Sequence, residues 1–108
     1  MRTLSRPRAA LPAAMLALAA LPAVAQDAKT LHLRALAATC ANCHGTNGRA
    51  VDGASVPGLA GMPASYMVEQ LKAFKAGSRP ATVMHQLAKG YSDAQIEAVA
   101  GWFSTQPK

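Results

Sequence analysis

The chain has two cysteines, Cys40 and Cys43, separated by two residues, and His44 directly follows the second. A zinc site needs four ligands, and the other histidines, His32 and His85, are isolated in the sequence and supply no second pair. A thioredoxin-type dithiol requires a βαβ unit, yet no useful length of sequence alternates with the period of a strand. A disulfide across so short a loop would constrain the unfolded chain little. The remaining use of this spacing is covalent haem attachment, for which C-x-x-C-H is the signature.

Haem attachment explains why these three residues stand together. Two thiols add across the two vinyl groups of one haem, while the adjacent imidazole ligates the iron from one side. We therefore expect one covalently attached haem c, with Cys40 and Cys43 as thioether anchors and His44 as an axial iron ligand.

Residues 1–25 are predicted to be a cleaved secretory signal. The first eight residues include three arginines, an alanine-rich apolar run follows, and the run ends in the small-residue triplet Ala23-Val24-Ala25. The alternative is an uncleaved membrane anchor, but the run is short for a membrane span and contains two prolines. We expect cleavage after Ala25, a periplasmic domain at residues 26–108, and no permanent membrane anchor.

The charge of the exported domain does not favour a nucleic-acid partner. Residues 26–108 keep eight of the eleven basic residues and all five acidic ones, which lowers the net charge from +6 to +3. A nucleic-acid surface would need a denser basic patch with interleaved aromatics. The domain has only five aromatic residues, so its side-chain core is thin and haem is expected to fill part of the interior.

The exported domain is predicted to be all-α. Leucines and alanines dominate residues 29–41, which indicates a helix that runs into the cysteines. A second helix is expected after Pro63 and ends at Gly77. The last helix has the clearest start, because Ser92 and Gln95 have the spacing of a capping box.

Glycines and prolines break every periodicity between Gly45 and Gly61. A loop of this length in a small domain is uncommon unless it wraps something functional. Near the end of the chain, Gly101 beside Trp102 predicts a close crossing of the terminal helices.

The second axial ligand decides between classes of function. An open position suits a haem sensor or a peroxidase-like domain, whereas a methionine thioether favours electron transfer and raises the reduction potential. Met67 shares an apolar helix face with other core candidates and is expected to be buried. Met84 lies between two expected helices, where the chain can return over the opposite face of the haem. Position alone favours Met84 and leaves Met62 and His85 as alternatives.

Four segments, "CANCHG", "GLAG", "VEQLKAFKAG" and "VMHQLAKGYSDAQIEAVAGWF", resemble the small class I cytochromes c, in particular the cytochrome subunit of flavocytochrome c sulfide dehydrogenase. The resemblance runs from Leu36 to Gln106. It implies a class I cytochrome c fold of about four short helices and a long Gly/Pro loop around one haem. It makes Met84 the distal ligand, and it implies a backbone carbonyl near Pro57 as the partner of the second N–H of His44. Some of these subunits carry two haem domains, and a chain with one CxxCH corresponds to the single-haem form.

The function implied by the resemblance is periplasmic electron transfer. An FAD-containing flavoprotein dehydrogenase subunit would oxidise sulfide and pass electrons singly to the haem, and a soluble cytochrome or an oxidase would accept them. The chain has no flavin fingerprint, so it is not expected to be catalytic alone. The alternatives are a free monohaem carrier between a periplasmic donor and a terminal oxidase or reductase, and the sensor or peroxidase-like domain.

Overall fold

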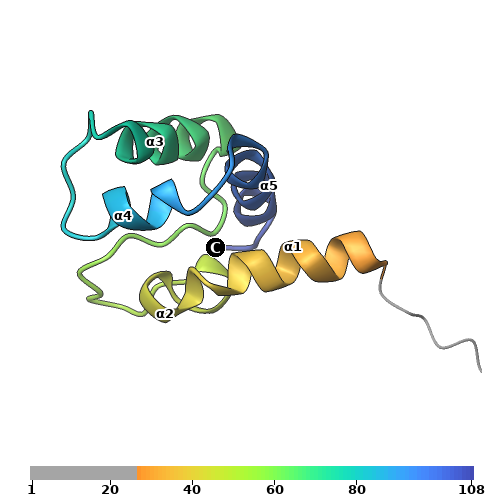
Figure 1. Ribbon diagram of the computed structural model, residues 1–108. Helices are drawn as coiled ribbons and strands as arrows, with labels where there is room; N and C mark the ends of the chain where they lie inside the picture. The colour runs from red at the N-terminus through yellow and green to blue at the C-terminus, as the bar shows by residue number, and fades with distance from the viewer. Residues whose placement is uncertain (1–26) are drawn as a thin grey trace, which may run out of the picture.

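The computed structural model describes residues 27–108, and the expected signal segment at residues 1–25 lies outside them. Within residues 27–108 the chain is entirely helical and contains no strand, so the predicted all-α class is confirmed (Figure 1). None of the helices in this range is long and apolar enough to cross a membrane. The elements in chain order are α1 (Ala28–Ala38), α2 (Ala41–His44), the 3₁₀ turn η1 (Thr46–Gly48), α3 (Ala64–Ala76), α4 (Met84–Lys89) and α5 (Asp93–Ser104).

Two predicted helix ends, both marked by capping residues, are present in the structure. Gly77 closes α3 with a left-handed φ of 78°, a conformation that glycine adopts without a steric penalty. The Ser92 hydroxyl accepts a hydrogen bond from the Gln95 amide (3.1 Å), and the Gln95 side chain accepts one from the Ser92 amide (2.9 Å). This reciprocal pair is the predicted capping box at the start of α5.

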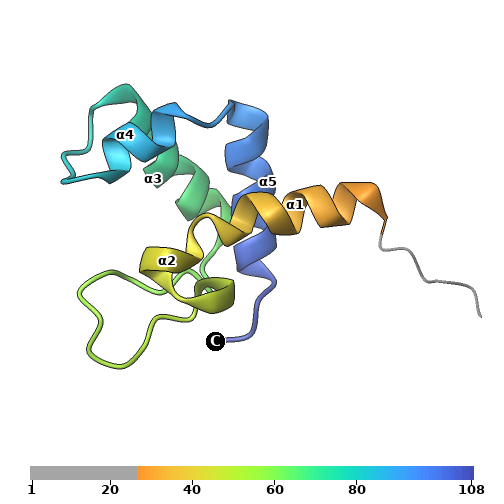
Figure 2. The ribbon, with the colours of Figure 1, turned by 60° about the horizontal axis from the view of Figure 1, so that its bottom comes forward.

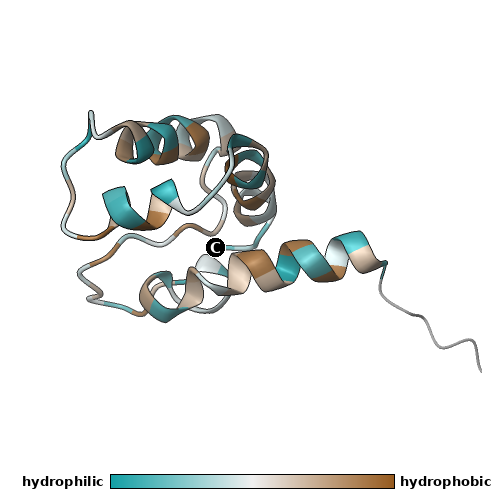
Figure 3. Cartoon of the chain, in the orientation of Figure 1, coloured by the Kyte–Doolittle hydropathy of each residue, from teal (hydrophilic) through white to brown (hydrophobic). Residues whose placement is uncertain are grey.

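The helices α1, α3 and α5 meet at the core. α3 packs against α4 and α5, and α1 packs across α5 (Figures 1 and 2). Apolar and polar residues share the surface of each of these helices (Figure 3), as expected of amphipathic helices with one buried face. Met67 is buried in this core as predicted; the buried cluster consists of Ala37, Met67, Val99, Ala100 and Phe103.

The expected role of Gly101 at the crossing of the terminal helices is wrong. A Cβ at Gly101 would meet no neighbouring atom within 4 Å, so the absence of a side chain there relieves no contact. The small residues buried in the core are instead Ala37 of α1 and Ala100 of α5, which are 3% and 0% exposed. Alanine is small and has a high helix propensity, so these two residues allow α1 and α5 to approach closely.

The segment at residues 29–41 also differs from the single helix expected. α1 ends at Ala38 and α2 begins at Ala41. The Thr39 hydroxyl donates to the Leu36 carbonyl (2.7 Å), and the Cys40 amide bonds to the Ala37 carbonyl (3.1 Å) in a tightened last turn. Threonine thus competes with the helical hydrogen-bond ladder immediately before the first cysteine.

Met84, expected between two helices, is the first residue of α4. The Val83 carbonyl accepts hydrogen bonds from the amides of Gln86 (3.0 Å) and Leu87 (3.1 Å), which starts the helix at this point. Six residues are too few for a hydrophobic periodicity to be read from the sequence, so the boundary could not be placed in advance.

Candidate haem site

The CxxCH residues occupy one helical turn. The amides of Cys43 (3.3 Å) and His44 (3.0 Å) both donate to the Cys40 carbonyl. Residues three and four apart lie on the same face of a helix. The two thiols and the imidazole are therefore presented from one side of α2, as attachment of a single flat group requires.

Cys40 and Cys43 do not pair in a disulfide; Cys40 is half-buried and Cys43 is exposed. Burial is the main cause that raises the pKa of the Cys40 thiol; the hydrogen bond to Thr39 partly offsets it, and the neighbouring Cys43 adds to it. Across residues 27–108, no group of three or more His, Cys, Asp or Glu side chains is arranged to hold a metal ion. The geometry thus gives no support to a disulfide or to a zinc site.

His44 is the one buried polar side chain found in the described part of the chain. Its Nδ1 donates a hydrogen bond to the Pro57 carbonyl oxygen at 2.6 Å, because a carbonyl can only accept. Since Nδ1 carries the proton, Nε2 keeps the lone pair that metal ligation needs. The hydrogen bond implied by the resemblance is therefore present, and it fixes both the tautomer and the orientation of the ring.

The loop after α2 brings Pro57 to His44. Gly45 has a φ of 84°, and a Cβ at this position would lie 1.8 Å from the Arg49 carbonyl oxygen, so only glycine fits. The Gly48 carbonyl accepts hydrogen bonds from the amides of Leu59 (2.7 Å) and Ala60 (3.1 Å), which fold the loop back on itself. Glycine in this loop is thus a requirement of the geometry around the imidazole.

The candidates for the second ligand differ in their packing. Met67 is buried in the core and Met62 packs against the core cluster, so both thioethers have apolar neighbours there. Met84 is half-buried at the start of α4 and does not belong to that cluster. His85 beside it is also half-buried, and its Nδ1 is buried without a hydrogen-bond partner.

The residues around α4 fit a large apolar group. Val83 and Leu87, one helical turn apart, are 53% and 51% exposed, so the protein side chains leave aliphatic surface uncovered along α4. Together with the two cysteines and the oriented imidazole, these apolar side chains match the chemistry of covalently attached haem. The donor set and its surroundings therefore fit the cofactor that the sequence predicted.

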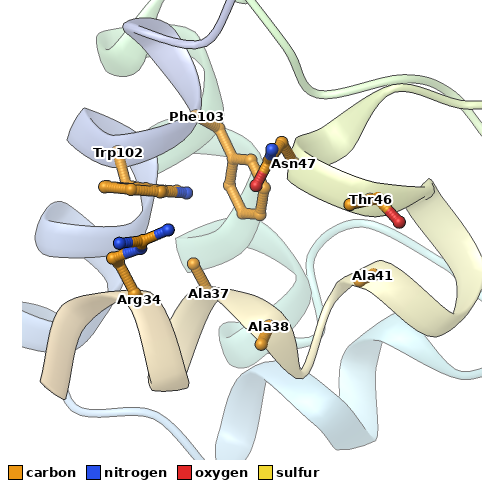
Figure 4. A pocket seen from close by; sticks show the side chains of 8 residues that line it. All are labelled: Arg34, Ala37, Ala38, Ala41, Thr46, Asn47, Trp102 and Phe103. Carbon is orange, nitrogen blue, oxygen red and sulfur yellow. The ribbon is translucent and has the colours of Figure 1, made fainter. Parts of the chain in front are cut away.

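A cavity of about 90 Å³ lies beside the attachment turn and is lined by residues of α1, α2, η1 and α5 (Figure 4). The Arg34 guanidinium lies 5.9 Å from the centre of the Trp102 ring, within the range of a cation–π interaction, and both side chains line the cavity. None of its lining side chains carries a thiol, an imidazole or a thioether. The lining residues are Arg34, Ala37, Ala38, Ala41, Thr46, Asn47, Trp102 and Phe103.

One contact beside the motif was missed by the sequence analysis. The Thr39 hydroxyl lies 2.5 Å from the Tyr91 hydroxyl, although the two residues are 52 positions apart. No local pattern signals a pair at this separation, and only the folded chain brings the two hydroxyl groups together.

Comparison with known proteins agrees with this geometry. The family model for cytochrome c matches residues 33–106. The "Thiosulfate dehydrogenase electron acceptor" of Thiomonas intermedia (strain K12) is 43% identical over 68 residues, which cover 63% of this chain and 31% of that protein. The "Cytochrome subunit of sulfide dehydrogenase" of Chlorobaculum tepidum is 38% identical over 73 residues, which cover 68% of this chain and 64% of that protein.

A third relative, "Cytochrome c-554(548)" of Halomonas halodenitrificans, is 37% identical over 71 residues, and the match covers 84% of its length. The chain spans only about a third of the two thiosulfate dehydrogenase electron acceptors that it matches. The family match itself covers most of the described residues. The chain therefore belongs to the cytochrome c family, as a class I c-type cytochrome with covalently bound haem c.

Proposed function

We propose that the protein is a one-electron carrier in which Cys40 and Cys43 attach the haem and His44 and Met84 are the axial iron ligands. The observation that carries this proposal is the hydrogen bond from His44 Nδ1 to the Pro57 carbonyl, which leaves Nε2 available for the iron. When bound, the haem supplies a ferric/ferrous couple, and methionine as the second ligand raises its potential.

Each proposed residue has a distinct task. The two thioethers hold the cofactor, and His44 is kept in one orientation by the loop. Met84 at the start of α4 supplies a soft thioether from the opposite side of the fold. Two strong protein ligands leave no position for a substrate, which favours electron transfer over the sensor or peroxidase-like alternative.

The proposed setting is the periplasm, reached by way of the signal at residues 1–25. The proposed electron donor is the FAD-containing flavoprotein of a sulfide dehydrogenase, supported by the resemblance of the "VMHQLAKGYS" segment and by the relative in Chlorobaculum tepidum. A soluble cytochrome or an oxidase would then accept the electron. The second candidate donor is a thiosulfate dehydrogenase, favoured by the 43% identity to the acceptor in Thiomonas intermedia.

Replacing Met84 tests the ligand assignment. In Met84→Ala holoprotein we expect loss of the far-red charge-transfer band of ferric iron bound by methionine, a high-spin spectrum, and carbon monoxide binding by the reduced form. Met62→Ala is the matched control, because that thioether packs against the core, and it should keep the band. A band that survives in Met84→Ala would exclude Met84 as the ligand.

Stopped-flow reduction tests the donor. The ferric holoprotein would be mixed with a sulfide-oxidising flavoprotein plus sulfide, and separately with a thiosulfate dehydrogenase plus thiosulfate. We expect fast reduction in the first mixture when the flavoprotein and the cytochrome are equimolar, with two haems reduced for each sulfide oxidised to the level of elemental sulfur. Fast reduction only in the second would favour the thiosulfate candidate, and no protein-dependent reduction in either would exclude both donors. Each substrate alone is the control.

A further inference from the structure

The direction of the hydrogen bond between Thr39 and Tyr91 follows from counting protons. The Thr39 hydroxyl has one proton, which it donates to the Leu36 carbonyl at 2.7 Å. Its oxygen can therefore only accept from the Tyr91 hydroxyl at 2.5 Å. Tyr91 is thus a hydrogen-bond donor to the residue that directly precedes the first haem-anchoring cysteine.

The backbone of Tyr91 is held firmly at the other end of this contact. Its amide donates to the Ala88 carbonyl in the last turn of α4 (3.2 Å). Its carbonyl accepts a hydrogen bond from Lys75 Nζ of α3 (2.7 Å), and the same ammonium group pairs with Asp93 at 2.9 Å. A tyrosine whose backbone is fixed by α3 and α4 can couple these helices to the residue that its hydroxyl contacts.

Few other contacts fix the position of α4 relative to the cysteine-bearing turn. Among the described elements, α3 is the one against which α4 packs extensively. α1 packs instead against α5, α2 and η1, and α2 packs against α1 and η1. The bond between the Tyr91 and Thr39 hydroxyls therefore links the end of α4 directly to the end of α1, across the two sides that would enclose the haem.

We propose that Tyr91 is a positioning residue for the distal side of the haem, and that its hydrogen bond to Thr39 holds α4 at the distance from the attachment turn at which Met84 stays on the iron. This inference rests on the proposed ligation by Met84. The hydroxyl of Tyr91 would keep Met84 on the iron, which is a more specific role than a contribution to the stability of the fold. Without the bond, α4 would move away from α2 more readily, and the position occupied by Met84 would open to small molecules.

Imidazole binding to the ferric holoprotein measures this opening, because imidazole can enter only when Met84 leaves. In Tyr91→Phe we expect imidazole to bind about two- to fivefold faster, the range that one partly exposed hydrogen bond supplies. Thr39→Val should act at least as strongly, since it also removes the bond to the Leu36 carbonyl, and the double variant should not exceed Thr39→Val, because Tyr91→Phe removes only the interaction that the two variants share. Thr39→Ser, which keeps the hydroxyl, and Tyr66→Phe, at an exposed tyrosine, should both match the wild type.

The outcomes separate the two proposals. Unchanged imidazole binding in Tyr91→Phe, or fully additive effects in the double variant, would overturn the positioning role. A lower unfolding free energy without faster imidazole binding would also overturn it, since that is the signature of a merely structural bond. If Met84→Ala instead keeps the methionine–iron band, the ligand assignment itself fails, and the spectrum of this variant distinguishes that failure from a failure of the Tyr91 proposal alone.

Discussion

Gly48 illustrates how a single residue supports the imidazole of His44. Its φ is 77°, and a Cβ there would lie 2.8 Å from Cδ1 of Phe103 and 2.9 Å from the Ala60 amide nitrogen. That amide is itself bonded to the Gly48 carbonyl, so it cannot retreat without breaking the fold-back of the loop. The conformation of Gly48 is therefore tied to both the core and the loop that carries Pro57.

Replacing Gly48 by alanine should lower the free energy of unfolding of the holoprotein by about 2–4 kcal/mol, the combined cost of a left-handed alanine and of overpacking. Gly53→Ala is the matched control, because Gly53 has nearly the same φ of 76° but open space around it. It should cost about 1 kcal/mol, the backbone term alone. Urea unfolding followed by circular dichroism measures both, and equal losses would mean that the close contacts at Gly48 are irrelevant.

Residue-level features were predictable wherever the chemistry is local. The packing of Met67 followed from its helix face, and the CxxCH spacing predicted the haem c that the cytochrome c family carries. The hydrogen bond between Thr39 and Tyr91 was not predictable, because each residue alone is an ordinary polar residue. Gly101 was misjudged because a glycine in a helix signals a close contact only if a neighbour lies there.

At the level of elements, Lys75 joins α3 to the start of α5. Its ammonium group pairs with Asp93 at 2.9 Å, and this hydrogen bond, followed by the charge of Lys75, lowers the pKa of the Asp93 carboxyl below its ordinary value of 3.8. A lowered pKa in the folded state means that the folded protein favours the ionised carboxylate. The pair therefore stabilises the fold above the ordinary pKa and ceases to do so as the pH falls through the folded-state pKa.

Asp93→Asn tests this linkage. We expect a small loss of unfolding free energy at neutral pH, which shrinks below pH 3.8 and disappears once the wild-type carboxyl is protonated. Glu97→Gln is the control, since its pair with Lys72 is longer, at 3.4 Å, and exposed, so its effect should be smaller. Urea unfolding across the acidic range measures the difference, and a loss for Asp93→Asn that persists at the lowest pH would contradict the assignment.

Element boundaries were predictable where capping residues mark them and not where side chains compete with the backbone. The roles of Gly77 and of the Ser92–Gln95 pair could be predicted from the sequence, because a left-handed glycine and a reciprocal cap are local motifs. The break between α1 and α2 depends on the Thr39 hydroxyl bonding to the Leu36 carbonyl, and the same residue types also occur inside helices. The start of α4 depends on α3, which packs along it.

At the level of the whole molecule, the described side chains alone make a small core. Of the seven buried apolar residues, three are alanines, which bury little surface. The four larger ones, Met67, Ile96, Val99 and Phe103, come only from α3 and α5. α2, α4 and the loop between η1 and α3 contribute no large buried apolar side chain, so their mutual arrangement requires another apolar body between them.

Preventing haem attachment should therefore abolish cooperative folding. We expect the Cys40→Ala/Cys43→Ala double variant, purified without haem, to lose most of its helical circular dichroism and its sharp thermal transition, because small domains with so little buried surface are at the limit of stability. Met84→Ala is the control, since it keeps both thioether anchors and should remain helical with a cooperative transition. A haem-free double variant that melted as sharply as the wild type would contradict this prediction. It would show that the side-chain core alone is sufficient for cooperative folding, and that folding does not depend on covering the exposed side chains of Val83 and Leu87 with haem.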